Sequence, residues 1–98
     1  MTYRLTRKAR DDLIEIYLYG FDVFGEAQAD AYHDMLARSF DRLAGNPFLA
    51  RERREIDPPV RIHPCGAHVI VYVEEAGGVL IVRIRHGRED WRDDPQRD

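Results

Sequence analysis

Two apolar runs joined by a glycine-containing turn constrain the fold more than any other feature of the sequence. Residues 68–74 (HVIVYVE) are rich in β-branched side chains, and residues 79–86 (VLIVRIRH) follow after the turn at 75–78 (EAGG). Runs of this kind on either side of a short turn are typical of a β-hairpin. In the first run the valines alternate with Ile70 and Tyr72, so both of its faces are apolar. We therefore expect it to be a central strand.

Two more strands are predicted elsewhere. Residues 60–63 (VRIH) alternate apolar and polar side chains, and 64–67 (PCGA) then turns the chain. Residues 3–5 (YRL) predict a short first strand near the N-terminus. In the last strand, regular alternation places Leu80, Val82 and Ile84 on one face and Ile81, Arg83 and Arg85 on the other. One face of the sheet is then expected to pack on helices while the other carries arginines.

The segment between the first strand and residue 47 predicts two helices. Thr6 is a good N-cap for the first, which we expect to end near Phe24. The second begins near Glu26 and ends at 45–47 (GNP), because glycine can cap a helix and proline cannot continue it. The short connection between them implies an antiparallel helical hairpin.

The first of these helices has a wider apolar surface than one buried face requires. One stripe at helical spacing consists of Ala9, Leu13, Ile16, Gly20 and Phe24. A second stripe consists of Ile14, Leu18 and Phe21, with Tyr17 between the two. Together they span roughly 200° of the helix surface, whereas a single buried face needs about 100°. Either this helix is buried on two sides or, as we expect, a partner covers the second stripe.

These elements have the order β-α-α-β-β-β. They predict one α+β domain over residues 1–98, in which an antiparallel sheet packs against an N-terminal helical hairpin. Residues 91–98 are charged and contain a proline, so we expect them to fray. The chain shows neither an apolar stretch long enough for a membrane span nor a signal peptide, which predicts a cytoplasmic protein without membrane contacts.

Composition argues against several classes of function. The formal net charge is −3, which disfavours direct nucleic-acid binding. Fourteen of the 15 basic residues are arginine, the side chain best suited to carboxylates and interfaces. Cys65 is the single cysteine, and three of the histidines, His63, His68 and His86, have no metal-ligand spacing. We therefore expect no metal and no cofactor.

Several motifs, in order, resemble toxins of the RelE/ParE superfamily from type II toxin–antitoxin systems. They are YRLTRKARDDLIEIYLYGFDVFGEAQADAY at 3–32, LAGNP at 43–47 and HVIVYVEEAGGVLIVRIRHGREDW at 68–91. The HGRED stretch within the last is similar to the ParE branch. The resemblance implies a bacterial toxin that is neutralised by an antitoxin encoded beside it. ParE-like members poison DNA gyrase, and RelE-like members cleave messenger RNA on the ribosome.

The residues near the C-terminus favour the ParE-like function. Ribonuclease members carry a Tyr or His where this chain has Trp91, and an indole cannot exchange a proton near neutral pH. His86 is the nearby titratable group, and no lysine follows residue 8. We therefore expect a protein-binding toxin without catalytic residues. The alternatives are a RelE-like ribosome-dependent endoribonuclease and a detoxified member that acts only in repression of its own operon.

The resemblance and the residue types together predict two binding surfaces. For the target, DNA gyrase, the candidates are Arg61, Arg83, Arg85, His86, Arg88, Asp90 and Trp91, because Trp and Arg contribute most to interfaces. For a ParD-like antitoxin, the candidates are Ile14, Tyr17, Leu18 and Phe21. A heterotetramer or larger complex is expected. The structural alternative is that Arg83 pairs with Glu89 or Asp90, His86 bonds a loop carbonyl and Trp91 covers the sheet edge.

Overall fold

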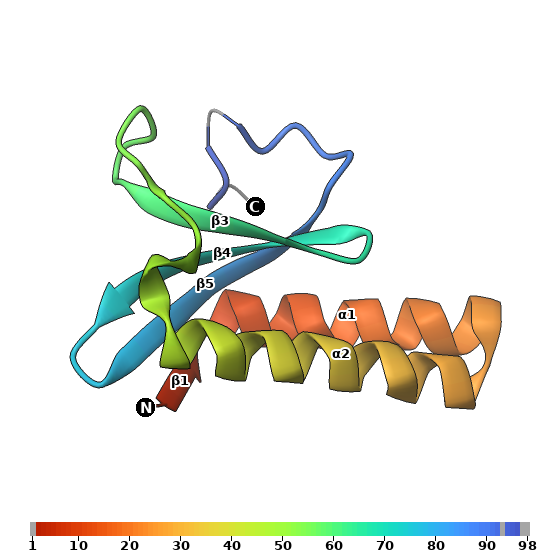
Figure 1. Cartoon of the computed structure of the whole chain (residues 1–98). Coiled ribbons are helices and arrows are strands. Elements are labelled where there is room, and N and C mark those ends of the chain that lie inside the picture. The colour runs from red at the N-terminus through yellow and green to blue at the C-terminus, as the bar shows by residue number, and fades with distance from the viewer. Residues whose placement is uncertain (1, 93, 97–98) are drawn as a thin grey trace.

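The computed structural model describes residues 2–92 and 94–96. It has a helical hairpin in one layer and a twisted sheet in the other, and the C-terminal segment crosses the far side of the sheet (Figure 1). In chain order the elements are β1 (Thr2–Leu5), α1 (Arg7–Phe24), α2 (Glu26–Gly45), a 3-10 helix η1 (Pro47–Leu49), β2 (Glu52–Arg53), β3 (Val60–Cys65), β4 (His68–Glu75) and β5 (Gly78–His86). Within the described residues, no helix is long and apolar enough to cross a membrane.

The sheet has five strands in the order β1-β5-β4-β3-β2. β4 lies between β3 and β5 and is antiparallel to both, which confirms the predicted central strand. The α+β class and the helical hairpin are also confirmed. The sheet is nevertheless mixed rather than wholly antiparallel, because β1 pairs with β5 in parallel. A short strand's direction depends on the long connection that follows it, and side-chain alternation does not encode that direction.

Local signals set the helix ends. The Thr6 hydroxyl accepts a hydrogen bond from the Ala9 N–H at 3.0 Å, as expected for an N-cap. Gly25 separates the two helices with a φ of 92°, a conformation that most side chains disfavour. Asn46 ends α2 and Pro47 begins the following 3-10 helix. These boundaries agree with the sequence prediction.

A β-bulge in β5 overturns the predicted alternation of that strand. Val71 pairs with Arg83 but Tyr72 pairs with Ile81, so Val82 is an extra residue without a partner on β4. As a result Ile81 and Ile84 both pack in the core beneath the sheet. The prediction that they occupy opposite faces was wrong, because a bulge shifts the period of two by one residue.

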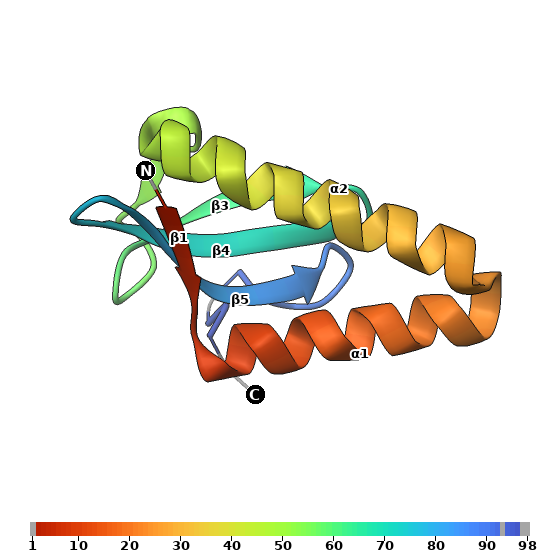
Figure 2. The same ribbon diagram turned by 90° about the horizontal axis from the view of Figure 1, so that it is seen from below.

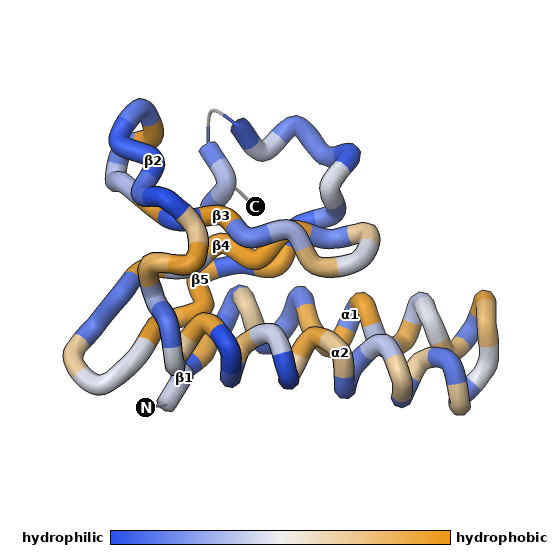
Figure 3. The backbone as a smooth tube through the Cα atoms, viewed as in Figure 1, coloured by the Kyte–Doolittle hydropathy of each residue, from blue (hydrophilic) through white to orange (hydrophobic). Residues whose placement is uncertain are grey.

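Two apolar clusters stabilise the sheet from its two sides. The larger lies between the sheet and the helices, and its largest buried side chains include Leu36, Phe40 and Tyr72. The smaller contains residues of β3 and β4 together with Ile56 and Trp91. Hydrophobic residues accordingly concentrate along β3, β4 and β5 (Figure 3).

The C-terminal segment contributes to the smaller cluster. In the tail predicted to fray, the side chains of Trp91 and Pro95 are buried. Residues 93, 97 and 98 of that tail lie outside the described residues.

The hairpin is longer than the sheet that it supports. Seen from below, the connected ends of α1 and α2 extend past the strands (Figure 2). The sheet therefore does not cover this projecting part of the hairpin, where five large apolar side chains of α1 are exposed. They are Leu18, Tyr19, Phe21, Val23 and Phe24.

Candidate functional site

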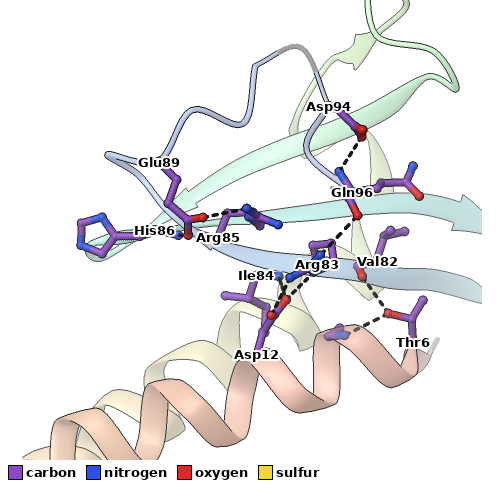
Figure 4. Close-up of polar contacts among 11 residues, drawn as sticks. Thr6, Asp12, Val82, Arg83, Ile84, Arg85, His86, Glu89, Asp94 and Gln96 are labelled. Carbon is purple, nitrogen blue, oxygen red and sulfur yellow. Dashed lines mark hydrogen bonds and ion pairs between the residues drawn. The ribbon is translucent and has the colours of Figure 1, made fainter. Parts of the chain in front are cut away.

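Side chains, rather than a further strand, close the outer edge of β5. Among the described residues, β1 pairs with Gly78–Ile81, and no strand pairs with the second half of β5 on this edge. There Thr6 Oγ1 donates to the carbonyl of Val82 at 2.7 Å, and the Asp12 carboxylate accepts from the Ile84 N–H at 3.0 Å (Figure 4). These contacts satisfy backbone groups that an unprotected edge strand presents to other chains.

Arg83 is held on this edge by the same carboxylate. Its Nε and Nη2 atoms lie 2.7 and 2.9 Å from the two oxygens of Asp12, and Nη1 donates to the carbonyl of Gln96 at 3.2 Å. Arg83 is 9% exposed. The structure thus shows Arg83 paired with a carboxylate of α1, a partner that the sequence did not predict.

Arg85 and Arg61 also have carboxylate partners. Arg85 is nearly buried, and its Nη2 lies 2.7 Å from Glu89 Oε2. Burial alone raises the pKa of Glu89, but the hydrogen bond from the His86 N–H and the Arg85 guanidinium hold that pKa below its usual value.

Arg61, on β3, is equally shielded. It donates to the carbonyl of Ala50 at 2.7 Å and to Glu74 at 3.2 Å, and its guanidinium lies 4.9 Å from the ring centroid of Phe48. Arg83 and Arg85 thus form internal contacts on the face of the sheet where the sequence predicted an open, cationic surface. Arg61 lies on the opposite face, because it alternates with Val60 and Ile62 of the smaller cluster and pairs with Tyr72 of the larger one.

The turn after β5 divides the remaining predicted target-binding residues. His86, Arg88 and Asp90 are exposed, and the backbone N–H of Arg88 donates to His86 Nδ1 at 3.1 Å. Trp91, in contrast, is 7% exposed and packs on the apolar residues of β3 and β4. The guanidinium of Arg53 lies 5.8 Å from its ring centroid. This stretch therefore has an exposed tip and an anchored base.

A groove of about 720 Å³ lies between the overhanging hairpin and the nearby end of the sheet. Its apolar wall includes Ile16, Gly20 and Phe24 of α1 and Ala29 of α2. The sequence analysis did not find this groove, because its existence depends on how far the hairpin extends past the strands.

Polar side chains form the end of the groove next to the sheet. Tyr32 accepts a hydrogen bond from the Ala67 N–H at 3.1 Å, and its hydroxyl lies 2.5 Å from His68 Nδ1. The ring of His86 lies 5.3 Å from that of His68, centroid to centroid. Burial, together with the nearby His86, lowers the pKa of His68. The Nδ1 atom of a neutral His68 can therefore accept a hydrogen bond from the Tyr32 hydroxyl.

The four predicted antitoxin-binding residues form an apolar surface that we call the outer stripe: Ile14, Tyr17, Leu18 and Phe21. Ile14, Leu18 and Phe21 are 57%, 56% and 45% exposed. Tyr17 is half-buried, and its hydroxyl donates to Asp30 at 2.6 Å. The structure therefore leaves this stripe uncovered.

The arrangement of titratable groups offers no evident metal site. In the part of the chain that the structure describes, no three His, Cys, Asp or Glu side chains are placed to hold a metal ion together.

Comparison with known proteins identifies the family. The family model described as the ParE toxin of the type II toxin–antitoxin system parDE matches residues 3–91. This chain belongs to the ParE toxin family. Toxin ParE1 of Mycobacterium tuberculosis is 36% identical over 89 residues, covering 90% of this chain and 91% of that protein. Toxin ParE1 of Caulobacter vibrioides is 30% identical over 84 residues, or 86% of each chain.

A solved structure confirms the ParE-like fold. The chromosomal ParDE toxin–antitoxin system from P. aeruginosa contains a chain that matches with a TM-score of 0.71 and 22% identity. The match covers 88% of this chain and 95% of that one. The resemblance inferred from the ordered motifs is therefore confirmed at the level of both family and fold.

Proposed function

We propose that this ParE-family toxin acts in the cytoplasm by binding DNA gyrase, without catalytic residues of its own, and that a ParD-like antitoxin holds it inactive. The observation that supports a protein-binding toxin rather than a ribonuclease is that three of its arginines contact carboxylates. A ribonuclease needs cationic groups that can reach a phosphate in the transition state. Arg61, Arg83 and Arg85 instead contact Glu74, Asp12 and Glu89.

The position of Trp91 adds to this argument. It stands where ribonuclease relatives carry a proton-transferring side chain, and it is packed against the sheet. A buried indole can neither donate a catalytic proton nor stack on a nucleotide.

The proposed target-binding surface is the exposed tip at 86–90. His86, Arg88 and Asp90 are its contact residues, because their side chains reach solvent. Arg83, Arg85 and Trp91 hold the tip from below. Arg61 is not part of this surface, because it contacts Ala50 and Glu74 and pairs with Tyr72, four residues along β4 from the His68 that pairs with His86 at the tip. Of these residues, only those at the tip are expected to contact gyrase.

The proposed antitoxin-binding surface is the hairpin. The outer stripe supplies an exposed apolar face, and the groove on the other side of α1 supplies a second. A segment that covers both faces would bury Ile14, Leu18 and Phe21 of the outer stripe together with Tyr19 and Phe24, which line the groove. Such burial supports a tight complex, and a heterotetramer or larger assembly is proposed.

The decisive experiment is a supercoiling and cleavage assay with purified toxin, gyrase, ATP and relaxed plasmid. Accumulation of cleaved plasmid, reversed by added antitoxin, is expected. Unaffected gyrase would contradict the proposed target. Ribosome-dependent cleavage of messenger RNA would then support the endoribonuclease alternative, and His86 would be the first residue to replace. Absence of toxicity in cells together with operator binding by the complex would support a detoxified member that acts only in autoregulation.

A further inference from the structure

Two rows of acidic residues border the outer stripe. On α1, Asp11, Glu15 and Asp22 are spaced by four and seven residues, so they lie on one side of the helix, and all are exposed. On α2, Asp30 and Asp34 line a shallow hollow together with residues of the stripe. The surface is therefore apolar along its centre and acidic along both edges.

Basic residues are missing from this whole region of the sequence. Residues 11–37 contain seven acidic residues and neither Lys nor Arg. Their formal charge is −7, whereas the whole chain has −3, so the remainder of the chain carries +4. Among the described residues, Asp12 is the acid of this segment that pairs with an arginine, Arg83. Asp30 accepts a hydrogen bond from Tyr17, and the carboxylates of both rows are exposed, so that cations of a partner can reach them.

This charge distribution discriminates between possible occupants. A second copy of the chain, docked stripe to stripe, would bring acidic rows against acidic rows, and like charges across an interface are strongly unfavourable. Nucleic acid and an anionic membrane are repelled for the same reason. A partner with cationic side chains on both edges is attracted.

We propose that the outer stripe binds a basic amphipathic helix, whose apolar face packs on Ile14, Leu18 and Phe21 and whose Lys or Arg side chains pair with both acidic rows. The stripe residues have the spacing i, i+4, i+7, which is how one helix presents a seam to another. The chemistry of the surface stands on these residues alone. That the helix is a segment of the antitoxin rests on the proposed function.

Charge reversal at each edge tests the proposal with the antitoxin encoded beside this chain. The variants are Glu15→Lys on α1 and Asp34→Lys on α2. The matched control is Asp41→Lys, which changes the charge equally at an exposed position outside residues 11–37. Dissociation constants are measured at low and high salt. Each edge variant is expected to weaken binding about tenfold or more at low salt and less at high salt, with no change in the control.

The outcomes separate this inference from the proposed function. If Leu18→Ser weakens binding but both charge reversals leave it unchanged, the basic helix is refuted and the antitoxin site stands. If the antitoxin does not bind even the unaltered toxin, the proposed function fails. Two synthetic helical peptides then test whether the outer stripe binds a basic amphipathic helix. The two peptides have the same apolar face, and the residues beside that face are Arg in one peptide and Glu in the other.

NMR reports where each peptide binds. The expected result is that the Arg-flanked peptide shifts the resonances of Ile14, Leu18 and Phe21 and the Glu-flanked peptide does not. Equal binding of both peptides, or of neither, overturns the proposal.

Discussion

Arg83 on β5 and Asp12 on α1 form a two-pronged ion pair with N···O distances of 2.7 and 2.9 Å. Their side chains are only 11% and 12% exposed. Because Asp12 also accepts from the backbone of Ile84, one carboxylate fixes both the strand edge and the arginine. This relationship joins the helical hairpin, which we propose binds antitoxin, to the strand that leads into the proposed target-binding tip.

Replacement of Asp12 by Ala is expected to destabilise the fold strongly. It leaves a nearly buried guanidinium without its carboxylate and an edge N–H without its acceptor. The loss expected for breaking a buried pair is about 3–5 kcal/mol in the free energy of unfolding, measured by urea denaturation. The matched control is Glu75→Ala, which breaks the exposed pair with Arg4. A loss no larger than that of the control would contradict a structural role for Asp12.

The sequence predicted the features whose signals are local. Thr6, Gly25 and Asn46 mark the helix ends because capping depends on neighbouring residues. The two apolar faces of the 68–74 run likewise identified β4 as central. The wide apolar surface of α1 was also visible, because helical periodicity depends only on spacing.

The features that were missed depend on contacts between distant parts of the chain. Asp12 and Arg83 are 71 positions apart, and neither residue alone predicts the other. The parallel pairing of β1 and the bulge at Val82 are set by how the hairpin packs along β5. The burial of Trp91 requires the chain to cross the far face of the sheet, which no local pattern records.

Arg88→Ala is expected to reduce gyrase inhibition without a loss of stability. The side chain is exposed, and interface arginines often contribute 2 kcal/mol or more to binding, which corresponds to roughly 30-fold in affinity. The dose of toxin that causes half-maximal plasmid cleavage measures the effect. Antitoxin affinity serves as the internal control and should not change. Full potency of the variant would exclude Arg88 from the target contact.

Trp91→Ala is expected to affect stability and target binding together. Removal of a packed tryptophan costs about 3–5 kcal/mol and leaves a cavity over β3 and β4. Thermal unfolding followed by circular dichroism measures this loss. Trp91→Phe fills much of the same space, so it should restore most of the stability and most of the gyrase inhibition. If Phe restores stability but not inhibition, the indole contacts the target directly and its proposed supporting role is wrong.

The double substitution Leu18→Ser with Phe21→Ser is expected to weaken antitoxin binding and leave the fold intact. Both side chains are about half exposed, so their loss removes apolar area from the complex rather than from the core. Isothermal titration measures the change, which should exceed tenfold. The control is Phe48→Ser, an equally apolar and even more exposed residue on η1. Equal effects of the two would show that general surface apolarity, not the stripe, governs binding.

The half-buried His68, at the end of the groove next to the sheet, predicts that the free energy of unfolding falls in mild acid. Burial keeps the pKa of His68 below its ordinary value of 6.5, so the unfolded chain binds more protons than the folded one in this range. The contribution of His68 is therefore full above pH 6.5 and decreases as pH falls below that value toward the folded-state pKa. His68→Gln should flatten the fall in urea midpoint between pH 7.5 and 5. His63 has a lowered pKa for the same reason, so His63→Gln should remove a separate part of the fall. An unchanged pH profile in His68→Gln would show that burial does not keep the imidazole of His68 neutral.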